Sequence, residues 1–242
     1  MKRYLIFLGV LLICGFSTQL NGQVLITLLL GDKLNSDQLS FGLAGGLQTS
    51  SITNLEGAKF LNTFNLGFFF DIKLAEGFYL HPEVLVKSNL GARDLPTYPT
   101  TDPDLDKLLA GARVERRINY FNIPILAKYR TQNGWGVEAG PEFSLRHKAR
   151  DEFKTGVGEN EELLLTVDIR DQLTRLDAGF AGGLSKKIGK TRAGVTIYVR
   201  YYAGLVDIDK VTEGTQRNQS ILLNAAIPIG AGKDLAEMME EE

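Results

Sequence analysis

The sequence predicts an all-β protein, an eight-stranded antiparallel up-and-down β-barrel that spans a membrane. The first observation is a strict alternation of apolar and polar residues over about eight segments, which is the period of a strand with one apolar face. The second is that the connections between these segments alternate between long and short, which is typical of outer-membrane barrels. The third is an N-terminus with the charge and apolar pattern of an export signal.

The N-terminus decides the predicted compartment. Lys2 and Arg3 precede an apolar run over residues 4–16, which is too short to span a bilayer as a helix but suits the core of a secretory signal peptide. We predict a signal peptide over residues 1–22, with Gly15, Ser17 and Gly22 as alternative cleavage points. A periplasmic segment over residues 23–38 then leads into the barrel.

The only cysteine, Cys14, lies in the predicted signal peptide. Because bulky Ile13 precedes it, we do not expect lipid attachment, and the mature chain would have no thiol for a disulfide or a metal. The formal net charge of −2 is mildly acidic and gives no reason to expect nucleic acid as a partner.

The barrel is expected over residues 39–230, followed by an acidic tail over residues 231–242. The predicted strands are Leu39–Gln48, Asn62–Leu74, Phe78–Ser88, Ile118–Arg130, Trp135–Arg146, Leu173–Lys187, Arg192–Leu205 and Asn218–Ile229. Short turns follow the second, fourth and sixth strands, and the Asn133-Gly134 pair after the fourth is a strong hairpin signal. The other connections are longer, so the odd strands would run outward and the even strands inward.

The second strand illustrates the two rows. Its apolar row is Phe64, Leu66, Phe68, Phe70 and Ile72. Across the eight segments the opposite row contains Asp71, His81, Glu83, Lys87, Lys128, Glu138, Glu142, Arg146, Arg175, Asp177, Arg192 and Arg200. Each lysine or arginine facing lipid at mid-bilayer would cost roughly 2–4 kcal/mol. A fold of marginal stability cannot tolerate the sum, so these charges are predicted to face the lumen.

The inverted arrangement, a soluble lipocalin-like binder, would place the apolar row inside. An eight-stranded barrel holds only its own side chains or one small ligand, and roughly two dozen large apolar side chains would overfill it. Aromatic residues also gather at the two ends of the predicted strands: Phe78, Tyr129 and Trp135 near the short turns, and Phe121, Phe143 and Tyr201 near the long loops. Two such bands are typical of a membrane barrel.

Several motifs resemble the PorT-like outer-membrane β-barrel domain, often labelled porin family protein. They are Phe41-Gly42-Leu43 with Gly45-Gly46, Tyr120 to Tyr129 with its Ile-Pro-Ile-Leu-Ala-Lys-Tyr sequence, Gly140-Pro141, and Asp177-Ala178-Gly179. The resemblance covers about residues 39–229 and implies an outer-membrane barrel in the size class of OmpA and OmpX. The chain departs from such barrels by continuing into an acidic tail instead of finishing on an aromatic residue.

The lumen is expected to be closed by paired charges and by inward Phe69, Leu85, Leu126, Tyr198 and Tyr202. We therefore predict a non-enzymatic surface, scaffold or envelope protein. The alternatives are a narrow small-solute or ion channel and, less favoured, a lipid-modifying enzyme.

Catalytic candidates are few. His81 lies two residues from Glu83 on the lumen row, and His147 lies three residues from Ser144 but on the other phase. Neither forms a recognisable catalytic arrangement. We expect no catalytic residue, no cofactor-binding residue and no metal ligand. The expected partners are outer-membrane lipids and, through the long loops at 90–114 and 148–172, a protein.

Overall fold

The computed structural model describes residues 38–100, 102–156, 162–189, 194–212 and 214–229. The predicted signal peptide, nearly all of the predicted periplasmic segment and the predicted acidic tail lie outside the described residues. Predicted Arg192 on the lumen row also lies outside them.

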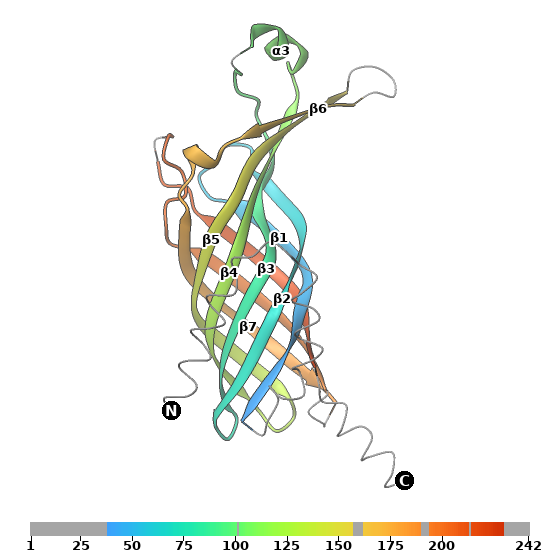
Figure 1. Cartoon of the computed structure of the whole chain (residues 1–242), viewed down its shortest axis with the longest axis vertical. Coiled ribbons are helices and arrows are strands. Elements are labelled where there is room, and N and C mark those ends of the chain that lie inside the picture. Colours follow the sequence, from blue (N-terminus) through green and yellow to red (C-terminus); the bar gives the residue numbers. More distant parts are fainter. Residues whose placement is uncertain (1–37, 101, 157–161, 190–193, 213, 230–242) are drawn as a thin grey trace.

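Eight strands close into a ring, as predicted. The strands of the ring are β1 (Leu39–Ile52), β2 (Lys59–Ala75), β3 (Phe78–Leu95), β4 (Arg113–Arg130), β5 (Trp135–Gly156), β7 (Leu176–Ile188), β8 (Val195–Gly204) and β9 (Asn218–Pro228). Each pairs antiparallel with the next, and β1 closes the ring on β9 from Gly42↔Pro228 to Ile52↔Asn218. Figure 1 shows the strands tilted around the barrel, with the long connections at one end and the short turns at the other.

The two regions predicted as long loops, 90–114 and 148–172, are largely regular structure, so the sequence prediction was wrong there. β3 continues to Leu95 and β4 begins at Arg113. β5 continues to Gly156. An additional strand outside the ring, β6 (Glu162–Asp168), pairs with the end of β5. The physical reason is that the strand alternation continues past the bilayer.

This outer part of the sheet is called the extension below and comprises residues 89–95, 113–119, 147–156 and 162–168. The β4–β5 ladder runs through it as far as Arg113↔Lys154. At about 3.3 Å per residue, the seven residues from Asn119 to Arg113 carry the sheet roughly 20 Å beyond the barrel. In Figure 1 the extension projects from the long-loop end and carries β6 and α3.

A short helix interrupts the connection between β3 and β4. It is α3 (Pro103–Leu108), and the Asp102 side chain caps it by accepting a hydrogen bond from the Asp104 amide at 2.9 Å. A single 3₁₀ turn, η2 (Arg170–Gln172), lies between β6 and β7. No helix among the described residues is long and apolar enough to cross a membrane.

The apolar row faces outward and the charged row faces inward, as predicted. Outward apolar side chains that are well exposed include Leu43, Leu47, Phe78, Ile125, Val137, Phe143, Leu176, Phe180, Leu184, Ile197, Val199, Ile221, Leu223 and Ile227. Predicted lumen charges that are buried are Asp71, His81, Glu83, Lys128, Glu138, Glu142, Asp177 and Arg200. Exposed leucine and phenylalanine around a charged interior exclude the soluble, inverted arrangement.

Two charges predicted for the lumen row are exposed instead. Lys87 is exposed, and its ammonium lies 5.6 Å from the centre of the Phe64 ring. The register of β3 slips between Leu85 and Ser88, so the strand bulges there and the later residues change phase. Arg175 is also exposed, because it lies just before β7 begins. Arg146 is partly buried and donates to the carbonyls of Leu173 and Thr174.

Glycine permits the close approach of strands in the wall of the lumen. A Cβ atom added to Gly183 on β7 would collide with the Val199 carbonyl oxygen and would lie 2.9 Å from the Arg200 Cα. The absence of a side chain at this position leaves room for the backbone of Val199 and Arg200 on the neighbouring strand.

Candidate functional site

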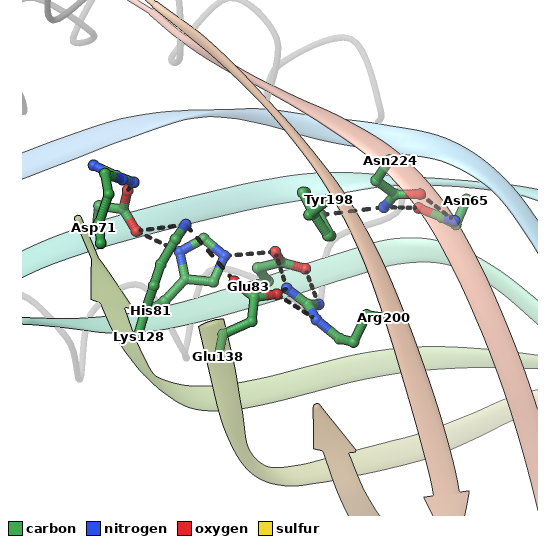
Figure 2. Close-up of polar contacts among 10 residues, drawn as sticks. Asn65, Asp71, His81, Glu83, Lys128, Glu138, Tyr198, Arg200 and Asn224 are labelled. Carbon is green, nitrogen blue, oxygen red and sulfur yellow. Dashed lines mark hydrogen bonds and ion pairs between the residues drawn. The ribbon is translucent and has the colours of Figure 1, made fainter. Parts of the chain in front are cut away.

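The centre of the lumen is an arginine held by two carboxylates. Arg200 on β8 has no exposed side-chain surface, and its two terminal nitrogens each donate to a Glu83 oxygen at 2.8 Å. Its Nε and Nη2 also donate to Glu138 Oε1 at 2.9 and 2.6 Å. Figure 2 shows the guanidinium between the two carboxylates.

These contacts cross the lumen. Glu83 is on β3 and Arg200 is on β8, and in the ring β4, β5 and β7 separate these strands. The bidentate pair therefore ties distant walls of the barrel together, which a bond between neighbouring strands would not do. The planar, five-donor guanidinium is the side chain best suited to two carboxylates at once.

His81 continues the network toward the short-turn end. Its Nδ1 lies 2.6 Å from Asp71 Oδ1, and its Nε2 lies 2.7 Å from Glu83 Oε1. An imidazole that carries a proton on both nitrogens satisfies both carboxylates, whereas a neutral ring satisfies only one. The sequence prediction that His81 faces the lumen beside Glu83 is confirmed.

Asp71 and Lys128 close the network into a loop. Asp71 accepts from Arg130 Nη2 at 2.7 Å and lies 3.4 Å from Lys128 Nζ. Lys128 Nζ in turn lies 3.7 Å from Glu138 Oε2. The loop is therefore Asp71, His81, Glu83, Arg200, Glu138 and Lys128, which we call the lumen charge network.

Contacts within one strand or between neighbouring strands make half of this network, namely Asp71 with His81, His81 with Glu83 and Lys128 with Glu138. Lys128 on β4 is paired directly with Glu138 on β5, so two of the charges are fixed by register alone. Buried ions are costly to desolvate and are tolerated when paired and hydrogen-bonded. The arrangement is suited to holding walls together and offers no charge left free to act on a substrate.

A neutral polar layer lies beside the lumen charge network. Asn65 on β2 and Asn224 on β9 exchange two amide hydrogen bonds of 2.9 and 2.7 Å. Asn224 also donates to the Tyr198 hydroxyl at 3.2 Å. Figure 2 shows this layer alongside Arg200. Around it Phe69, Leu85 and Tyr198 pack with Ala44, Leu222 and Ala226, which confirms the predicted inward positions of the first three residues.

Further toward the long loops, isolated polar pairs replace the network. Glu142 accepts from the Asn122 amide at 2.8 Å. Asn218 donates to Asp177 at 2.8 Å and to the Tyr120 hydroxyl at 3.2 Å. The predicted inward positions of Leu126 and Tyr202 are also confirmed, and both side chains are buried.

An apolar cluster covers this end of the lumen and continues into the extension. Its buried members include Ile52, Leu90, Leu95, Leu109, Val114, Ile118, Tyr120, Phe153, Ile169, Leu173 and Ile208. The cluster draws on β3, β4, β5, the segment between α3 and β4, and the β8–β9 connection, so it fastens the extension to the barrel.

One buried ion pair lies within the extension. Arg116 on β4 donates to Asp151 on β5 through two bonds of 2.9 and 2.8 Å. The Tyr98 hydroxyl donates to the same carboxylate at 3.0 Å. Burial and the adjacent Asp151 carboxylate raise the pKa of Tyr98.

The catalytic candidates are not brought together. His147 is exposed on the outside of β5, where its ring stacks on Phe121 with centroids 4.7 Å apart. Ser144 is buried toward the lumen. Among the residues that the structure describes, no group of three or more histidine, cysteine, aspartate or glutamate side chains could hold a metal ion.

Sequence reasoning identified most of the charges that enter the lumen but not how they pair. It also missed the ion pair between Arg116 and Asp151. The alternation of β4 continues through Arg116, but the register of β5 against β4 shifts between Arg146 and Lys148, so Asp151 shares the inward face with Glu142 only because of this irregularity.

A closed ring with an outward apolar belt, a charge-packed lumen and short turns at one end defines an integral membrane β-barrel. The model of the outer membrane protein beta-barrel domain family matches residues 22–210. The chain belongs to this family and lies in the outer membrane. In such barrels the short turns face the periplasm, so the long loops and the extension are extracellular.

Solved structures similar to the chain are also outer-membrane proteins. The attachment invasion locus protein Ail of Yersinia pestis is 10% identical, with 80% of this chain and 100% of that chain covered and a TM-score of 0.43. Neisserial surface protein A is 11% identical, with 79% and 99% covered and a TM-score of 0.40. OprG of Pseudomonas aeruginosa is 13% identical, with 79% and 93% covered and a TM-score of 0.37. No curated protein matches the chain.

Proposed function

We propose that this protein is a non-enzymatic outer-membrane barrel with a closed lumen, which acts as a surface or scaffold protein of the envelope and not as a pore. The single observation that supports the proposal is the cross-lumen attachment of Arg200 to Glu83 and Glu138. A pore needs a continuous water path, and here three charged side chains and the rings around them occupy the middle of the barrel.

The scaffold role would reside in the extension. Its inner face is apolar and its outer face carries ion pairs, so it forms a folded platform beyond the barrel. We therefore keep 90–114 and 148–172 as the proposed protein-binding regions, now as sheet and helix surfaces and not as loops. The finer relationship to PorT-like barrels is also a proposal, and it rests on the Ile-Pro-Ile-Leu-Ala-Lys-Tyr strand of β4.

Planar-bilayer conductance tests the closed lumen. We expect the purified wild-type barrel to give no discrete openings. Loss of Arg200 should admit water and ions, so Arg200→Ala is expected to show openings. The matched control is Arg175→Ala, which removes an exposed cation just before β7 and should stay silent.

Discrete openings of the wild-type protein would refute the proposal and support the narrow-channel alternative. Silence of both wild type and Arg200→Ala would leave the wild-type lumen closed but would remove Arg200 as the reason. Capture of a defined partner from intact envelopes, lost on deletion of the β5–β6 hairpin, would support the scaffold role separately.

A further inference from the structure

A polar cavity opens on the outside of the barrel at the extracellular end of β8 and β9. Its volume is about 350 Å³, and its lining includes Thr53, Asn54, Tyr201, Thr215, Arg217 and Gln219. The β1–β2 turn forms one wall, and β8 with the start of β9 forms the other. This cavity is separate from the lumen charge network.

The cavity contains one cation without a partner. Arg217 is exposed, and within the described part of the chain no ion pair or hydrogen bond involves its guanidinium. By contrast, Arg200 in the lumen and Arg116 in the extension are paired with carboxylates. A guanidinium offers a planar set of donors that matches phosphate oxygens.

The walls of the cavity are fixed before any ligand arrives. The Arg217 amide donates to Thr53 Oγ1 at 3.1 Å, and the Thr53 amide donates to the Arg217 carbonyl at 2.9 Å. The Asn54 side chain bonds the Thr215 carbonyl at 2.8 Å, with Asn54 held at φ 55°. The backbone of Arg217 is therefore held in place, and only the Arg217 side chain has to become ordered when a ligand binds.

The cavity lies at the upper border of the apolar belt. From the periplasmic end to the extracellular end, the outward row leading along β9 is Ile227, Ala225, Leu223, Ile221, Gln219 and Arg217. Tyr201 is paired with Ile221 and is half exposed beside it, as an aromatic residue of the membrane interface is. The Arg217 side chain therefore lies just beyond Ile221, the last apolar residue of the outward row.

We propose that this cavity binds the phosphorylated sugar headgroup of an outer-leaflet glycolipid. Arg217 receives the phosphate, and the sugar hydroxyls lie against the Tyr201 hydroxyl and the Gln219 amide, which share a hydrogen bond of 3.3 Å at the rim of the cavity. The acyl chains continue down over Ile221 and Leu223. A soluble sugar phosphate shares the headgroup chemistry, but it would leave the apolar surface below the cavity unused.

The experiment is a titration of the folded barrel in detergent micelles with diphosphoryl lipid A, followed by native mass spectrometry. The variants are Arg217→Ala, Arg217→Lys and, as a matched control, Lys107→Ala on α3, far from the apolar belt. A charge-assisted contact to phosphate is worth enough that we expect Arg217→Ala to weaken lipid A binding roughly tenfold or more. Arg217→Lys should lose less affinity than Arg217→Ala, because it keeps the charge but not the planar set of donors, and Lys107→Ala should bind as wild type does.

Three results would overturn the proposal. The first is no binding of lipid A by the wild type, and the second is equal binding by the wild type and Arg217→Ala. The third is binding of free glucosamine 1-phosphate as tight as that of lipid A, because it would assign the cavity to a soluble ligand. Heat-modifiable migration on gels checks that each variant is folded, and Arg217→Lys keeps the test decisive if the alanine variant is not.

Discussion

Replacing Arg200 by methionine tests whether the lumen charge network holds the barrel together. The change keeps an unbranched, shorter apolar side chain and removes four hydrogen bonds to Glu83 and Glu138, of 2.6–2.9 Å. Two buried carboxylates then lose their main counter-ion. Removing one partner of a buried ion pair costs about 3–5 kcal/mol. We expect a loss of that size in the free energy of unfolding.

The measurement is reversible urea unfolding of the barrel in lipid bilayers. Trp135 is the only tryptophan and lies exposed on the lipid-facing side of the periplasmic end, so its fluorescence reports insertion. The compensated variant Arg200→Met with Glu83→Gln and Glu138→Gln removes the uncompensated charge and should recover most of the loss. The control Arg175→Met should change the free energy of unfolding by no more than about 0.5 kcal/mol.

A loss below about 1 kcal/mol in Arg200→Met would refute the reasoning, because it would mean that the lumen is wet enough to solvate both carboxylates. Equal losses in Arg200→Met and the compensated variant would point to lost packing and not to unpaired charge. The two results separate the electrostatic from the steric role of the same side chain.

Three further predictions concern the packing of the barrel wall, the lumen and lipid faces of the barrel, and the extension. Gly183→Val should fail to fold or lose about 1–3 kcal/mol of unfolding free energy through overpacking in the barrel wall, seen as lost heat-modifiable migration. Lys128→Leu should strongly destabilise the barrel, whereas Lys87→Leu, on the lipid side, should be neutral or slightly stabilising in the same urea assay. The pKa of Tyr98 is raised in the folded chain, so protonated Tyr98 contributes to the stability of the folded state. This contribution is complete below the unfolded pKa of ~10 and is lost as the pH rises above that value. Protease cleavage of the extension should therefore accelerate above pH ~10 in the wild type, and this acceleration should be weaker in Tyr98→Phe.

The fold could be predicted from the sequence because hydrocarbon leaves few choices. Every outward position over a bilayer thickness must be apolar, so the alternation along each strand is strict and the strand count is readable. The sequence reasoning ended the strands near Ser88, Ile118 and Arg146, because the polar and charged stretches beyond them were interpreted as loops and the remaining lengths suited a bilayer. The extension has the same alternation for a different reason, since it packs against its own apolar cluster. Membrane thickness alone therefore could not show that the sheet continues.

Local irregularity accounts for the displaced charges. Lys87 follows the phase of its strand in the sequence, but the bulge near Leu85 reverses that phase. A bulge with one extra residue cannot be recognised from the alternation of apolar and polar residues, because the sequence still alternates on both sides of it. The result is a lysine over an aromatic ring at the membrane border instead of a further charge in the lumen.

The pairing of the lumen charges depends on the closure of the ring. Alternation shows that Glu83 and Arg200 share a face, but they are 117 residues apart, and neighbouring strands do not bring them together. Their contact exists because eight strands make a lumen narrow enough for one arginine to reach across. A wider ring of the same strands would leave each charge facing water and would need no pairing. The closed lumen is therefore a consequence of the number of strands in the ring. Substitutions of Arg200 test both properties together.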